Sequence, residues 1–71
     1  MTLGRLTTRE REVFSLVAQG MASKEIAESL GLRLATVASH RRSICRKLSI
    51  HSAAELVYQA VTVMTRELTC P

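Results

Sequence analysis

Residues 23–47 constrain the fold of this chain more than any other stretch, because they predict two helices joined by one short turn. The stretch reads SKEIAESLGLRLATVASHRRSICRK. Apolar residues at helical spacing predict a helix over about residues 24–30, capped by Ser23, and a second helix over about residues 34–48. Gly31 lies between them and can adopt the positive φ that ends a helix.

Three residues across this turn have the spacing that is typical of a helix-turn-helix. Ala27 is small enough to let a neighbouring helix approach, Gly31 forms the turn, and Val37 is an apolar residue of the second helix. At about 100° per residue, the core stripe of the second helix consists of Leu34, Val37, Ile44 and Leu48. The opposite, exposed face consists of Ala35, Ser39, Arg42 and Arg46.

The exposed face of the second helix is cationic and has no acid nearby. The chain has ten Lys and Arg residues against six acids, a formal net charge of +4, and no Asp or Glu from Arg33 to Ser52. A helix face that is only solvated more often carries both Glu and Lys. A cationic face favours an anionic partner. We therefore interpret the pair as a helix-turn-helix that places its second helix in the major groove of DNA.

Two further helices complete the predicted fold, an all-α, four-helix domain that covers residues 1–71. Thr7 and Glu10 match a capping box that opens a helix over about residues 8–19, whose charged residues 9–12 we expect to be solvated. Ser52 and Glu55 match a second box, which opens a helix over about residues 53–66. The predicted core stripe of this last helix consists of Ala53, Leu56, Val57, Ala60 and Met64.

The last helix also carries a strip of residues that its core stripe does not need. This strip consists of Ala54, Tyr58, Val61 and Thr65. A helix rarely exposes such a strip beside a complete core without a partner. The sequence therefore predicts that these residues form a homodimer interface.

The sequence does not favour an enzyme, a metalloprotein or a membrane protein. It contains no nucleophile–base–acid set and no Gly-rich phosphate loop, and we expect no catalytic residue and no cofactor. Its histidines and cysteines lack the spacing of zinc ligands, so we expect no metal; they are His40, Cys45, His51 and Cys70. No stretch approaches the roughly 20 apolar residues of a membrane span, and MTLGRLTTRE lacks the apolar run of a signal peptide. We expect a cytoplasmic protein with no membrane partner.

Three segments resemble a known family. LTTREREVFSLVAQGMASKEIAESLGL, ATVASHRRSICRKL and SAAELV are similar to the DNA-binding domain of the LuxR family, also called the NarL/FixJ or GerE type. The resemblance extends from Leu6 to about Ala60. It implies a transcription regulator that dimerises through its fourth helix and forms the C-terminal output domain of a longer response regulator or sensor protein. The partners that it implies are double-stranded DNA, a second copy of the chain and RNA polymerase.

The resemblance also implies the DNA contacts, position by position. It implies base reading by Ala38, Ser39 and Arg42. It implies contacts with the DNA backbone by Lys24, Thr36, His40, Arg46 and Lys47. We add Arg33 to the backbone contacts, because its side chain is long enough to reach a phosphate.

Three positions depart from the residue that is usual in the family. Thr8 stands where proline is usual at the first helical position, and only the pre-organisation of that residue is lost. Arg33 stands where serine usually caps the second helix of the pair, so the predicted start of that helix lacks a side-chain cap. Ala38 stands where lysine is common, and it can offer a base no more than an apolar contact, such as one with a thymine methyl group.

Three alternative functions stay open at this point. The promoter-reading domain of a sigma factor has a similar helix-turn-helix, although such domains usually end soon after the recognition helix. A helical protein-interaction module would use the strip around Tyr58. An RNA-binding domain is disfavoured, because Phe14 and Tyr58 are the only aromatic residues that could stack on bases. Titration with duplex DNA at low and moderate salt separates the DNA-binding function from the protein-binding one.

Overall fold

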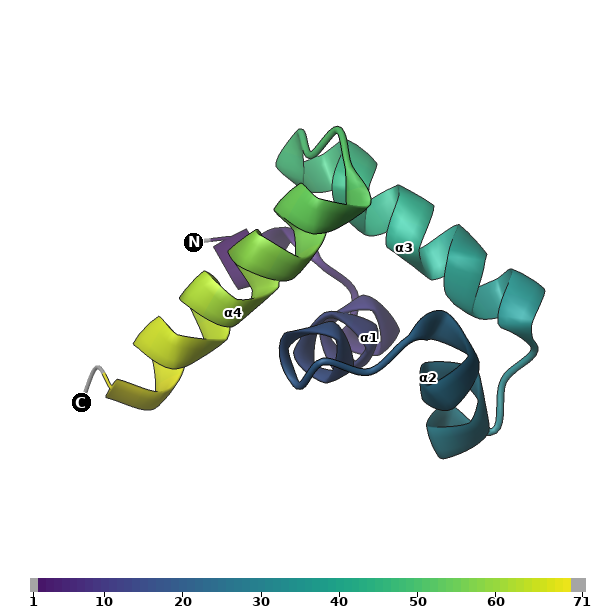
Figure 1. Ribbon diagram of the computed structural model, residues 1–71. Coiled ribbons are helices and arrows are strands. Elements are labelled where there is room, and N and C mark those ends of the chain that lie inside the picture. Colours follow the sequence, from purple (N-terminus) through teal and green to yellow (C-terminus); the bar gives the residue numbers. More distant parts are fainter. Residues whose placement is uncertain (1, 70–71) are drawn as a thin grey trace.

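Four α-helices and one short 3-10 helix make up the computed structural model of this chain (Figure 1). The structure describes residues 2–69, and their side chains from residue 4 to residue 66. The elements in chain order are η1 (Thr2–Arg5), α1 (Thr8–Ala18), α2 (Ser23–Leu30), α3 (Leu34–Leu48) and α4 (Ala53–Thr69). No strand occurs among residues 2–69, and the predicted all-α fold with a helix-turn-helix at α2 and α3 is confirmed.

Helix α1 is the element on which the others pack. It contacts α2, α3 and α4, and α2 packs in addition on α3. In Figure 1, α3 and α4 diverge from the turn that joins them, and α1 and α2 lie in the space between them. The largest fully buried side chains come from all four helices, which gives one shared core; they include Phe14, Ile26, Val37, Ile44 and Leu56.

Local hydrogen bonds fix where the helices begin and end. The capping box of α1 is confirmed, since the Glu10 N–H donates to Thr7 Oγ1 (3.2 Å) and the Thr7 N–H donates to Glu10 Oε1 (2.9 Å). Gly31 ends α2 in the left-handed conformation with φ 67°, as predicted. Helix α3 has the predicted bounds, although the side chain of Arg33 at its N-cap makes no capping hydrogen bond.

Three predicted helix ends are wrong by one to three residues. Helix α1 ends at Ala18 and not at Gln19. Ser23 is the first residue of α2 and not its cap; the cap is Ala22, whose N–H donates to the Glu25 carboxylate (2.8 Å). Helix α4 continues to Thr69, because nothing after Arg66 interrupts it. Cys70, expected in the tail, lies outside the described residues.

Three residues that were predicted in core stripes are exposed. Leu34 is 54% exposed, because the first residue of α3 lies at the edge of the stripe formed by Val37 and Ile44. On α4, Ala53 and Val57 are exposed for the same reason, since they flank the row of Leu56 and Ala60 that faces α1. The buried stripes of α3 and α4 are therefore narrower than the sequence predicts.

Candidate nucleic-acid interface

The surface of α3 opposite the core is open to solvent along its whole length. Val37 and Ile44 are fully buried, and this orientation exposes Ala35, Ala38, Ser39, Arg42 and Arg46 on the other side. Among the described side chains, neither Arg42 nor Arg46 forms a salt bridge. Two guanidinium groups are thus available on this face, beside side chains that are too short to screen them.

The amino end of α3 adds a further cation. Arg33 is exposed, and its carbonyl oxygen accepts from the N–H groups of Thr36 (3.0 Å) and Val37 (3.1 Å), which starts the helix without a side-chain cap. Thr36 and His40 are half-buried on the flank of α3. Lys24 is exposed in the first turn of α2.

Lys47 differs from the other residues predicted to contact the DNA backbone, because its ammonium group pairs with Glu10 of the same chain. Lys47 Nζ lies 2.7 Å from Glu10 Oε1, and the Ser43 hydroxyl donates to Glu10 Oε2 at 2.6 Å. The Glu10 residue is only 4% exposed, so the prediction that it belongs to a solvated face is wrong. The capping box predicts one role of Glu10, but no sequence signal connects it with Ser43 or Lys47.

This cluster keeps the Glu10 carboxylate ionised. The hydrogen bond from Lys47 and then that from Ser43 lower the pKa of Glu10 from 4.5 to about 2, although burial acts in the opposite direction. The positive charge of Lys47, whose side chain is 33% exposed, is therefore balanced by the nearly buried carboxylate of Glu10. It contributes less to the cationic surface of α3 than Arg42 or Arg46.

A hollow of about 380 Å³ runs beside α3, between the start of α2 and the turn that leads into α4. Ala38 and Arg42 line it from α3, Ser23 from α2, and His51 and Ser52 from the turn. The short side chain of Ala38 leaves this part of the surface open. Arg42 lies at its edge and belongs to the exposed face as well.

The predicted dimer contacts lie in α4, and we call them the α4 strip: Ala54, Tyr58, Val61 and Thr65. All four lie at the surface. Tyr58 is 68% exposed, and Ala54, Val61 and Thr65 are exposed with it. Val61 and Thr65 also line a hollow of about 320 Å³ that α4 forms with α1. The prediction that these residues contact a second copy of the chain stays a prediction.

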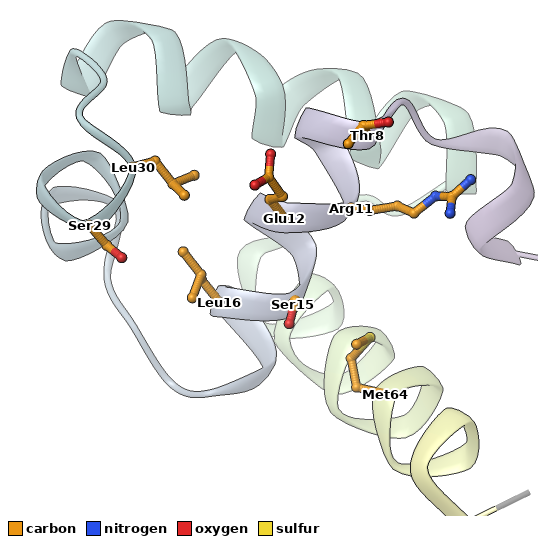
Figure 2. Close-up of a pocket in the computed structure, with 8 residues that line it drawn as sticks. All are labelled: Thr8, Arg11, Glu12, Ser15, Leu16, Ser29, Leu30 and Met64. Atoms are coloured by element: carbon orange, nitrogen blue, oxygen red, sulfur yellow. The ribbon is translucent and has the colours of Figure 1, made fainter.

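A larger groove of about 450 Å³ lies between α1, α2 and α4 (Figure 2). Its apolar side chains are Leu16, Leu30 and Met64, whereas the Arg11 side chain extends away from Leu16 and Leu30. None of the predicted site residues lines this groove. Glu12 at its rim pairs with Arg9 at 3.5 Å.

Two properties of the described residues bear on the other function classes. No group of three or more His, Cys, Asp or Glu residues among them is arranged to hold a metal ion. None of their helices has the length and apolar character that crossing a membrane requires. The feature that stands out is the exposed, acid-free face of α3 within a helix-turn-helix.

The arrangement of α2, a glycine turn and an exposed cationic α3 defines a helix-turn-helix domain. Residues 4–60 match the family model described as "Bacterial regulatory proteins, luxR family", so the chain belongs to this family and the predicted resemblance is confirmed. The family is one of regulatory proteins and is not a class of enzymes. No solved structure matches the chain at a significant level.

Several curated proteins are similar to this chain. "Uncharacterized response regulatory protein YgeK" of Escherichia coli is 46% identical over 57 residues, which cover 80% of this chain and 39% of that protein. "Transcriptional regulatory protein UhpA" of Escherichia coli is 51% identical over 51 residues, 72% of this chain and 26% of that protein. "Oxygen regulatory protein NreC" of Staphylococcus carnosus is 43% identical over 56 residues, 79% of this chain and 26% of that protein. The chain thus spans well under half the length of these relatives.

Proposed function

We propose that this chain binds double-stranded DNA sequence-specifically and serves as the DNA-binding part of a bacterial transcription regulator. The observation that carries the proposal is the exposed face of α3, which combines two unpaired arginines with short side chains and lacks acids. A helix of this kind fits the major groove, and its cations attract the phosphates on either side. The names of the relatives, which describe regulatory proteins, support the same function.

Within α3, base reading falls to Ala38, Ser39 and Arg42. Arg42 is the residue that we expect to contribute most, because a guanidinium group can donate two hydrogen bonds to the O6 and N7 atoms of guanine. The Ser39 hydroxyl can donate or accept. Contacts with the DNA backbone come from α2, the turn and α3, and we assign them to Lys24, Arg33, Thr36, His40 and Arg46. Lys47 would have to share its ammonium group between DNA and Glu10.

The assembly that we propose is a homodimer on DNA through the α4 strip. A two-fold pair of this helix would present two copies of α3 to one face of the duplex, with half-sites about 10–10.5 bp apart. We further propose that the chain acts as the output domain of a response regulator or sensor protein, in the bacterial cytoplasm and in contact with RNA polymerase. A similar protein that is named a response regulatory protein, and of which this chain covers only a part, supports the first of these points. Family membership makes this reading preferable to a sigma factor.

Selection from a random duplex pool followed by titration tests this function. The chain should enrich a defined half-site, and it should bind the enriched duplex about 10³-fold or more tightly than a scrambled duplex of the same composition. The log-affinity should fall linearly as log salt rises, because counterions are released. Equal affinity for the two duplexes at every salt concentration would contradict specific binding. Absence of any duplex binding at low salt would instead favour a protein-interaction module.

A further inference from the structure

An apolar side chain begins the exposed surface of α3. Four large hydrophobic residues are exposed among the described side chains, and Leu34 is the one that lies outside α4. Figure 1 shows the start of α3 at the end of the molecule opposite to the far end of α4, so Leu34 does not belong to the α4 strip. Ala38, four residues further along and the neighbour of Leu34 on the helix surface, is exposed as well.

Leu34 starts a row of residues spaced four apart, which we call the reading ridge: Leu34, Ala38, Arg42 and Arg46. All four are exposed, and residues four apart form a continuous ridge on a helix. The ridge is apolar at its first two positions and cationic at its last two. At about 1.5 Å per residue, neighbouring members lie about 6 Å apart along the axis, roughly the length of two base-pair steps.

The two halves of the ridge suit different base edges. Arg42 can donate to guanine, but neither Leu34 nor Ala38 can donate or accept a hydrogen bond. A guanine opposite the apolar half would leave its acceptors without a partner, and that is costly in a desolvated groove. The major groove exposes one apolar group, the C5-methyl of thymine, and 5-methylcytosine carries a methyl at the same place.

We propose that Leu34 and Ala38 recognise 5-methylpyrimidines in the major groove, with Ala38 about two base pairs and Leu34 about four base pairs from the guanine that Arg42 reads. This inference rests on the proposed DNA-binding function and names the chemistry of half of that site. Under this proposal, the exposed Leu34 contacts the same DNA duplex as the cationic end of the ridge. Such a contact also makes binding sensitive to methylation of cytosine at the same positions.

The experiment uses variants of the enriched duplex in which one thymine at a time loses its methyl group. Each thymine is replaced in turn by deoxyuridine, which removes only the methyl group, and the affinity is compared with that of the unchanged duplex. Burial of one methyl group corresponds to about a fourfold change in affinity. We expect a loss of this size at one or two positions near the guanine and no loss elsewhere.

Leu34→Gln and Val57→Gln make a matched pair of variants. Both replace an exposed apolar residue on a helix, so neither opens the core, but only Leu34 belongs to the reading ridge. Leu34→Gln should abolish the difference between thymine and deoxyuridine at one position, and Val57→Gln should leave every such ratio unchanged. Circular dichroism of each variant reports the fold independently.

Three results would overturn the proposal. Specific binding with no thymine-to-deoxyuridine difference at any position refutes the methyl contact and leaves the proposed function standing. A difference that persists unchanged in both Leu34→Gln and Ala38→Asn moves the contact to other residues, and Leu34 then becomes a candidate contact for a protein. Absence of specific binding to any duplex refutes the proposed function and this inference together.

Discussion

Lys47 Nζ lies 2.7 Å from the Oε1 atom of the buried Glu10, so the end of α3 is tied to the first turn of α1. The same carboxylate caps α1 through the Thr7 N–H and accepts from the Ser43 hydroxyl. One side chain thereby joins the start of the chain's first α-helix to the helix that we propose for DNA reading. The nearly buried carboxylate of Glu10 thus links α1 to α3.

The first prediction concerns how the stability of the fold depends on pH. The pKa of Glu10 is lowered from 4.5 to about 2 in the folded chain, so the folded state holds this proton less tightly than the unfolded state. The stabilisation is therefore complete above a pH of about 4.5 and is lost as the pH falls towards 2. Glu10→Gln should lower the free energy of unfolding at pH 7 by about 2–3 kcal/mol.

Thermal unfolding followed by circular dichroism between pH 7 and pH 2 measures this effect. The melting temperature of Glu10→Gln should lie well below that of the unchanged chain at pH 7 and approach it as the solution is acidified. Glu12→Gln is the matched control, because Glu12 lies in the same helix and forms only an exposed pair with Arg9. Parallel melting curves for Glu10→Gln and the unchanged chain over the whole pH range would contradict the assignment.

The second prediction separates the cations that we propose contact DNA from Lys47, which pairs with Glu10. Each phosphate contact contributes about 0.9 to the slope of log-affinity against log salt. Arg46→Gln and Lys24→Gln should each make the salt dependence less steep by about this amount. Each should also weaken binding evenly across sequences. Lys47→Met should change the slope by less, because Glu10 already balances the charge of Lys47.

Lys47→Met should instead destabilise the fold, since it leaves the Glu10 carboxylate buried without its ammonium partner. Combining it with Glu10→Gln should recover part of the loss, and the double-mutant cycle measures the coupling between the two side chains. A full change of slope in Lys47→Met, with unaltered stability, would make Lys47 a phosphate contact and not an internal partner of Glu10.

The helices could be predicted closely because their signals are local. The Thr7 capping box, the glycine at Gly31 and the apolar period of α3 each act within a few residues, and those three features are confirmed. The role of Glu10 could not be predicted, because its partners Ser43 and Lys47 lie 33 and 37 residues away in sequence. Only the packing of α3 on α1 brings them together.

The width of the buried stripe on each helix is another property that could not be predicted from the periodicity of apolar residues. An angle around a helix axis indicates which side faces inward, but it does not indicate where the neighbouring helix ends. Leu34 and Val57 both lie at the edges of predicted stripes, and both are exposed. The exposed face of α3 was easier to predict, because a face opposite a strong apolar stripe is open whatever the width of that stripe.

The third prediction concerns the guanine that we propose Arg42 contacts. A bidentate contact between arginine and guanine contributes about 1–3 kcal/mol of discrimination. Arg42→Ala should therefore flatten the preference at one base pair of each half-site, and selection from a random pool should reveal this in the enriched sequences. Arg11→Ala removes an exposed arginine on α1 and should leave the preference unchanged. The same preference in the Arg42 variant as in the unchanged chain would assign the contact to another residue.

The last prediction concerns the dimer that we propose through α4. Tyr58 is 68% exposed at the middle of the α4 strip, so Tyr58→Glu would place two like charges at or near the two-fold axis without disturbing Leu56 or Ala60 in the core. One helix that pairs with its copy buries less surface than a standard interface, so the free chain should be largely monomeric in dilute solution. On DNA, the adjacent half-site supplies a second connection and makes binding cooperative. Tyr58→Glu should therefore keep its helical content and its affinity for a single half-site, but lose cooperative occupancy of paired half-sites.

Titration of duplexes with one and with two half-sites, for each variant, measures this cooperativity directly. Ser29→Glu adds the same charge at an exposed position of α2, away from the α4 strip, and controls for repulsion between the added carboxylate and DNA. Ser29→Glu should lower the affinity for both duplexes by the same factor, so the ratio of the two affinities stays the same. The reason is that this variant leaves the contact between two copies of α4 intact. Unchanged cooperativity in Tyr58→Glu, with the fold preserved, would move the dimer contact to a surface other than the α4 strip.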